Sequence, residues 1–162
     1  MTYSEFRSQF ASTDSFMWAF GRLSIEEARA LIEAENTSAT VKACMMTAWR
    51  EARRKVMLRH VDVYFMENSS LSVVFHEYDS DYDGHDYEYR YSLDADNTAA
   101  FIDLIPHPCS ETKSNIEEWL CENVQCSGLG SDLPQKWVQM GLHGCYTVRE
   151  DYPGGIYREE AF

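Results

Sequence analysis

The stretch from Val61 to Leu93 constrains the fold most, because it contains three runs typical of β-strands joined by short turns. The first run extends from Val61 to Met66 and the second from Leu71 to His76, and both are rich in β-branched and aromatic residues. In the third run, from Tyr87 to Tyr91, tyrosine alternates with charged residues, as in a strand with one exposed face. The stretch therefore predicts an antiparallel β-meander.

The sixty residues before this stretch are predicted to be helical. Capping boxes, in which a Ser or Thr is followed three residues later by Glu, begin at Thr2 and Ser24. The apolar run Phe16–Phe20 predicts one or two helical turns that end at Gly21. A longer helix is predicted from Ala39 to Arg59, because apolar residues recur there on one side of a helical wheel. These apolar residues are Val41, Met45, Ala48, Ala52 and Val56.

The residues after the meander alternate between predicted helices and turns. Asp94 or Asp96 is expected to cap a helix that ends before Pro106, because proline removes a backbone donor and clashes inside a helix. A capping box at Ser114 begins the next helix, and Pro134 marks the first turn of a third. Shorter helices are therefore expected in this part of the chain.

Together these patterns predict an α+β fold in a single domain. With 44% hydrophobic residues, a chain of 162 residues can bury about two-thirds of its unfolded surface without a partner. No run of about 18 apolar residues occurs, and the first residues lack the pattern of a signal peptide, so we expect a cytoplasmic protein. The predicted parts of the domain 1–162 are a helical segment (1–60), the meander with its acidic turn (61–96), helices and a last strand (97–150), and a tail (151–162).

The charge of the chain is distributed unevenly. The net charge is −13. Residues 1–60 carry nine Lys and Arg against seven Asp and Glu, a net +2, whereas residues 61–162 carry five against twenty, a net −15. An acidic balance by itself keeps a small protein soluble. Its concentration in one part of the chain favours a role in binding.

The densest acidic cluster lies within residues 77–96, where tyrosines are interleaved with the carboxylates. Carboxylates spaced along a strand imitate the phosphates of nucleic acid, so a basic groove accepts them, and tyrosine adds contact area at low entropic cost. Tyr82, at the tip of the acidic turn, is the expected aromatic anchor. The predicted partner-binding residues are Glu77, Asp79, Asp81, Tyr82, Asp83, Asp86, Glu88, Asp94 and Asp96.

In size, charge and this acidic and aromatic pattern, the chain resembles the small acidic proteins with which phages and mobile elements block host defence. Anti-CRISPR proteins and antirestriction DNA mimics belong to this class. The resemblance covers residues 77–96, rests on no sequence motif and assigns no role to any residue. It implies a non-enzymatic inhibitor that occupies a basic surface of a nucleic-acid-binding protein, such as a defence nuclease, without itself binding nucleic acid or a membrane. An immunity protein that neutralises a basic toxin has the same features and is the first alternative.

A basic face on the predicted long helix gives a second alternative, a small protein that binds nucleic acid directly. Lys42, Arg50, Arg53 and Arg54 fall opposite the apolar side of that helix, where they either contact phosphates or simply face solvent. A basic helix and an acidic sheet in one chain are also complementary to each other. They therefore allow a homodimer held by charge.

Motifs for metal binding and catalysis are incomplete. The sequence Asp79-x-Asp81-x-Asp83-Gly84 matches the first half of a calcium-binding EF-hand loop, but Arg90 occupies the position of the bidentate glutamate. Five cysteines without regular spacing indicate reduced thiols. The motifs of phosphate loops, dinucleotide folds, serine hydrolases and zinc proteases are absent, so we expect neither an enzyme nor a cofactor. The residues that offer zinc ligands, without the spacing of a zinc module, are His107, Cys109, Cys121, Cys126, His143 and Cys145.

Overall fold

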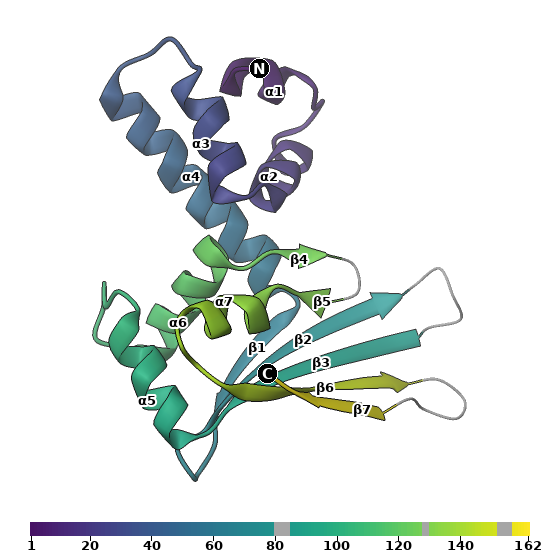
Figure 1. Ribbon diagram of the computed structural model, residues 1–162. Helices are drawn as coiled ribbons and strands as arrows, with labels where there is room; N and C mark the ends of the chain where they lie inside the picture. The colour runs from purple at the N-terminus through teal and green to yellow at the C-terminus, as the bar shows by residue number, and fades with distance from the viewer. Residues whose placement is uncertain (80–84, 128–129, 152–156) are drawn as a thin grey trace. The chain divides into compact units, whose positions relative to one another are not determined.

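The computed structural model describes residues 1–79, 85–127, 130–151 and 157–162 (Figure 1). The fold is α+β, as predicted, with seven helices and a five-stranded antiparallel sheet in the described residues. The chain divides into two compact units, residues 1–59 with 121–123, and residues 60–120 with 124–162. The division at Arg59 coincides with the predicted change from helix to strand. The single-domain organisation stays a prediction.

The first unit consists mainly of four helices whose starts the sequence specifies locally. Both predicted capping boxes are present: the Thr2 and Ser24 hydroxyls accept hydrogen bonds from the backbone N–H groups of Glu5 and Glu27, whose side chains accept in return. The bounds are α1 (Tyr3–Ser8), α2 (Thr13–Arg22), α3 (Ile25–Glu33) and α4 (Ala39–Leu58).

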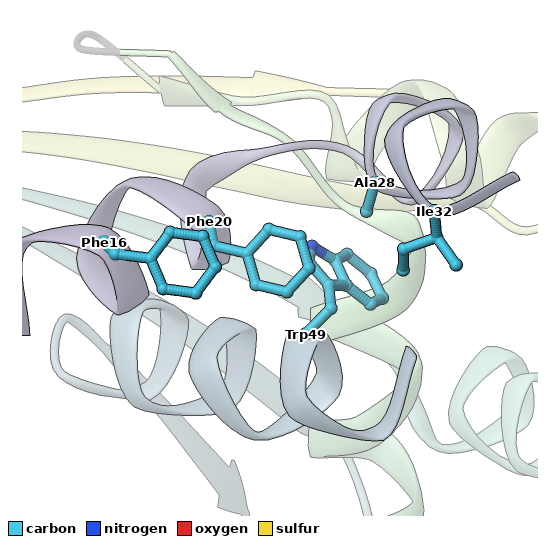
Figure 2. Close-up of a cluster of buried hydrophobic side chains, with 5 residues drawn as sticks. All are labelled: Phe16, Phe20, Ala28, Ile32 and Trp49. Carbon is cyan, nitrogen blue, oxygen red and sulfur yellow. The ribbon is translucent and has the colours of Figure 1, made fainter. Parts of the chain in front are cut away.

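The core of the first unit forms around Trp49 of α4, which is fully buried. Figure 2 shows its indole ring among side chains from α2 and α3. The indole N–H donates a hydrogen bond to the Leu23 carbonyl, with a nitrogen-to-oxygen distance of 3.2 Å, so its burial leaves no polar group unsatisfied. The other buried members of this cluster are Phe16, Phe20, Ala28 and Ile32.

Gly21 lies inside α2 and does not end that helix, contrary to the prediction. A Cβ atom at this position would lie 2.6 Å from the carbonyl oxygen of Ala52 on α4. Glycine is therefore needed because α2 and α4 approach each other closely at this position, and not because the helix ends there.

A link between α1 and the end of α3 depends on pH. Ser4 donates two hydrogen bonds to the Glu35 carboxylate, from its backbone nitrogen at 2.9 Å and from its hydroxyl at 2.7 Å. These bonds, the backbone one foremost, hold the pKa of Glu35 below its ordinary value. A lowered carboxyl pKa gives stability that is present above the ordinary pKa and is lost as the pH falls through the lowered one. We expect the protection of the Ser4 amide, that is, its hydrogen-exchange rate relative to the intrinsic rate at the same pH, to be lost over that acidic range and to be absent at neutral pH in Glu35→Ala, which removes the acceptor; protection unaffected by Glu35→Ala would contradict this.

The second unit is built on one antiparallel sheet with the strand order β1-β2-β3-β6-β7. The predicted meander is confirmed as β1, β2 and β3, each paired with the next strand. The connection from β3 to β6 contains three helices and a short strand pair. The bounds are β1 (Val61–Phe65), β2 (Leu71–Asp79), β3 (His85–Leu93), α5 (Ala95–Leu104), α6 (Thr112–Asn123), β4 (Cys126–Ser127), β5 (Gly130–Ser131), α7 (Leu133–Gln139), β6 (Gly144–Asp151) and β7 (Tyr157–Ala161).

Two sequence predictions for this unit were wrong. Part of the predicted tail is strand β7, which pairs with β6. Phe162, which follows β7, stacks on the buried ring of Trp137 with 6.0 Å between ring centroids. Helix α6 begins after Glu111, so Ser114 lies inside the helix and does not cap it. Stacking of the half-buried Phe162 ring on Trp137 gives the last strand an anchor that its charged sequence did not indicate.

The two faces of the sheet differ in polarity. Residues alternate between the faces, and Val63, Val73 and Tyr91 are buried on one face. The other face carries a hydrogen bond between the His76 ring and the Asp62 carboxylate at 3.0 Å and an ion pair of Glu88 with Arg90 at 3.3 Å. In the described part of the chain, no helix combines the length and the apolar character needed to cross a membrane.

Candidate partner-binding surface

The acidic residues of the β2–β3 hairpin lie beside its turn. Glu77 and Asp79 are in the last residues of β2, and Asp86 is the second residue of β3. The strand register pairs Tyr78 with Asp86 and Glu77 with Tyr87, so carboxylates and tyrosines alternate across the two strands. The rest of the predicted turn, with Asp81, Tyr82 and Asp83, lies outside the described residues, as does most of the calcium-like motif.

The structure adds two carboxylates that the sequence reading did not include. Strand β6 ends beside the start of β3, where Asp151 lies directly opposite Asp86 and Glu150 lies opposite Tyr87. The sequence predicted a strand near these residues, but it contained no signal for the partner of that strand. We call Glu77, Asp79, Asp86, Glu150 and Asp151 the acidic sheet end.

The register places two aspartates directly opposite each other at the acidic sheet end. Like charges at directly opposite positions of an antiparallel pair are destabilising, and Asp86 and Asp151 occupy such positions. A protein that needed charge only for solubility would avoid the cost by spreading its carboxylates. The arrangement favours a surface that meets positive charge on another molecule.

Glu88 does not extend the acidic sheet end. Its carboxylate pairs with Arg90 at 3.3 Å, and Arg149 lies opposite it in the register of β6. Glu88 is therefore largely neutralised within the sheet. Its predicted role in partner binding loses support for this reason.

Asp94 and Asp96 lie at the other end of β3 and do not share a surface with the turn. A strand of nine residues spans about 30 Å, which separates them from Asp86 by most of the sheet. Asp94 is the N-cap of α5: its carboxylate accepts hydrogen bonds from the backbone N–H of Asn97 at 2.8 Å and from its side chain at 2.9 Å. These bonds, the backbone one foremost, lower the pKa of Asp94. Asp94 and Asp96 therefore lie apart from the acidic residues beside the turn, and their role in partner binding stays a prediction.

Asp94 is accordingly expected to act on stability and not on binding. Asp94→Ala removes the acceptor for the first turn of α5 and should lower the melting temperature, whereas Asp94→Asn keeps a capping oxygen and should lower it much less. Thermal unfolding followed by circular dichroism measures both. Equal losses in the two variants would argue against the capping role.

The predicted basic face of α4 is not a single exposed surface. Arg53 is only 4% exposed, and its guanidinium donates hydrogen bonds to the carbonyls of Cys121, at 2.9 Å, and of Gly21, at 3.2 Å. Arg50 pairs with Glu122 at 2.9 Å, and Lys42 pairs with Glu33 at 3.3 Å. Arg54 is exposed. Because these contacts are internal, most of the predicted basic residues serve the fold of the first unit.

The candidate zinc ligands can be compared with the structure only where their side chains are described, which leaves out Cys126. In the part of the chain that the structure describes, no three His, Cys, Asp or Glu side chains are grouped to hold a metal ion. Cys121 is buried. The backbone N–H and thiol of Cys109 donate hydrogen bonds to the Asn115 side chain.

Comparison of the chain with protein-family models, with curated proteins and with solved structures found no significant match.

Proposed function

We propose that this chain is a non-enzymatic inhibitor whose acidic sheet end occupies a basic, nucleic-acid-binding surface of another protein. The observation that carries the proposal is the register of β2, β3 and β6, which gathers five carboxylate residues from segments far apart in the sequence. A defence nuclease and a basic toxin both offer such a surface. The nuclease is the better candidate, because spaced carboxylates imitate the phosphates that its groove already binds.

Charge and aromatic content of the acidic sheet end suit such a contact. Lysine and arginine of a partner would relieve the repulsion between Asp86 and Asp151. The relief of this repulsion would contribute to the free energy of binding. Tyr78 and Tyr87 hold register positions opposite Asp86 and Glu77, and tyrosine is enriched among the residues that dominate binding energy. Binding should therefore be fast, salt-dependent and specific for a basic groove.

Direct binding of nucleic acid has less support. The residues that would contact phosphates include the buried Arg53 and the paired Arg50 and Lys42. In addition, the net −15 of residues 61–162 repels phosphate. The inhibitor and the direct binder therefore differ in the molecule that they are expected to capture.

Affinity capture from the native host tests the proposal. The immobilised wild-type chain should retain a basic protein that binds nucleic acid, and high salt should release it, because exposed charge pairs are screened. The captured protein is identified by mass spectrometry and then tested for nucleic-acid binding when purified. Capture of nucleic acid itself, or of a partner that high salt does not release, would contradict the proposal.

A further inference from the structure

One edge of the sheet is open to pairing with another strand. Strand β1 is the first strand of the order β1-β2-β3-β6-β7, and within the described residues it pairs with β2 alone (Figure 1). Three consecutive side chains at its end are exposed although they are large and apolar: Tyr64, Phe65 and Met66, at 44% to 46% of their surface. Exposed apolar residues on an edge strand mark a site of contact with another chain.

The outward-directed backbone groups of β1 can be assigned from the pairing with β2. The His60 carbonyl accepts a hydrogen bond from the His76 nitrogen, and the Met66 nitrogen donates to the Ser70 carbonyl. Hydrogen-bonded positions alternate in an antiparallel pair, so Asp62 and Tyr64 direct their backbone groups to β2 as well. Val61, Val63 and Phe65 then direct their N–H and C=O groups away from the sheet. No backbone group of another described segment bonds to these three residues.

The two edges of the sheet are protected differently. The opposite edge strand, β7, carries Arg158, Glu159 and Glu160 in succession, and all three are exposed. Charges of this kind prevent edge-to-edge association. Strand β1, with the sequence VDVYF, has no lysine, arginine or proline, and its single charge, Asp62, is paired with His76 at 3.0 Å. Charged side chains therefore protect the β7 edge against edge-to-edge association, but not the β1 edge.

We propose that β1 pairs antiparallel with β1 of a second copy of this chain, about a two-fold axis at Val63. In this register Val63 exchanges backbone hydrogen bonds with Val63 of the second copy, and Val61 does so with Phe65 in both directions. All the outward-directed backbone groups of the strand are satisfied. The two sheets become continuous across the axis.

The register is complementary to itself in its side chains. Asp62 lies opposite Tyr64 of the second copy, whose hydroxyl can donate to the carboxylate, and the exposed Phe65 lies opposite the apolar Val61. A two-fold axis at Asp62 would instead place two aspartates opposite each other, where like charges are destabilising. A second copy of β1 therefore supplies a partner strand without opposed charges.

The dimer also determines how the two acidic sheet ends are arranged, and what this implies for basic partners rests on the proposed function. Antiparallel pairing of the two β1 strands makes the two β2 strands antiparallel as well. The two acidic sheet ends then lie at opposite ends of the joined sheet and point in opposite directions. Each dimer can meet two separate basic surfaces at once.

Sedimentation equilibrium of the full chain, with two variants matched for chemistry, tests the dimer. Phe65→Lys places a charge on the open edge, and Leu104→Lys makes a similar change at a 57% exposed position on α5, outside the sheet. We expect a dimer in the wild type and in Leu104→Lys at concentrations up to about 1 mM, and a dissociation constant at least about tenfold weaker in Phe65→Lys. Both substituted residues are exposed, so both variants should fold like the wild type.

Salt and hydrogen exchange separate this dimer from one held by charge. Raising the salt from about 0.1 M to about 1 M shortens the screening length from about 10 Å to about 3 Å. The β1 dimer should survive that change. The Val61 and Val63 amides should exchange more slowly in the wild type than in Phe65→Lys. A monomeric wild type, a dimer that dissociates in high salt, or equal dimerisation of the two variants would each overturn the proposal.

Discussion

Replacing Trp49 by alanine is expected to destabilise the first unit by about 3–5 kcal/mol, the range for removing a buried aromatic side chain. The ring is fully buried between α2, α3 and α4, and its N–H bond to the Leu23 carbonyl is lost as well. A loss of that size is a large fraction of the whole stability of a domain, about 5–15 kcal/mol. Hydrogen exchange at the amides of α2 and α4 measures the opening free energy of this unit separately from the sheet.

Val41→Ala is the matched control for Trp49→Ala, because it also shortens an apolar residue of α4. Val41 is 42% exposed, so its truncation should change the opening free energy by no more than about 0.5 kcal/mol. Trp49→Phe should fall between the two, since it keeps an aromatic ring but removes the N–H donor. Similar losses for Val41→Ala and Trp49→Ala would contradict the core described for the first unit.

The bounds of α4 could be predicted from the sequence, but its buried side could not. Its bounds followed from local signals, and the cap at Ser38 and the end at Leu58 agree with the prediction within a residue. The sequence pattern did not predict the buried side of α4 correctly, because it placed Arg53 on the solvent-facing side. The carbonyls that satisfy its guanidinium belong to Gly21 and Cys121, which are distant in sequence. The buried side of α4 carries Trp49 and Arg53, whereas Val41, which was predicted to be on the apolar side, is 42% exposed.

The sheet shows the same division between local and distant information. Alternating apolar residues and short turns predicted β1, β2 and β3. The pairing of β6 with β3 joins segments separated by three helices, for which the sequence contains no local signal. Glu150 and Asp151 therefore joined the candidate surface only through the structure, whereas the sequence had already predicted Asp94 or Asp96 as a helix cap, and Asp94 is that cap.

Reversing two charges of the acidic sheet end is expected to weaken partner binding by about 100-fold or more, since a close charge pair across an interface contributes about 1.5 kcal/mol or more. The variant is Asp79→Lys with Asp86→Lys. Asp86→Lys also replaces a like charge opposite Asp151 by an opposite one, so the sheet should not be weakened. Isothermal titration calorimetry with the captured partner measures the change.

A second double variant separates this local effect from the effect of net charge. Glu67→Lys with Asp103→Lys raises the net charge by the same amount, and both residues are exposed in the second unit. Glu67 precedes β2 and Asp103 lies on α5, so neither belongs to the acidic sheet end. This variant should bind within about threefold of the wild type, as expected when only long-range attraction is reduced. Equal weakening in the two double variants would mean that the partner responds to overall charge alone.

Displacement of nucleic acid from the captured partner tests the central proposal most directly. Fluorescence anisotropy of a labelled oligonucleotide bound to that partner is followed as each chain is added. The wild type and the Glu67→Lys, Asp103→Lys variant should release the oligonucleotide, and the Asp79→Lys, Asp86→Lys variant should leave it bound. Release by the variant with reversed charges at the acidic sheet end, or simultaneous binding of the wild-type chain and the oligonucleotide to the partner, would contradict the proposal that the acidic sheet end occupies the nucleic-acid surface.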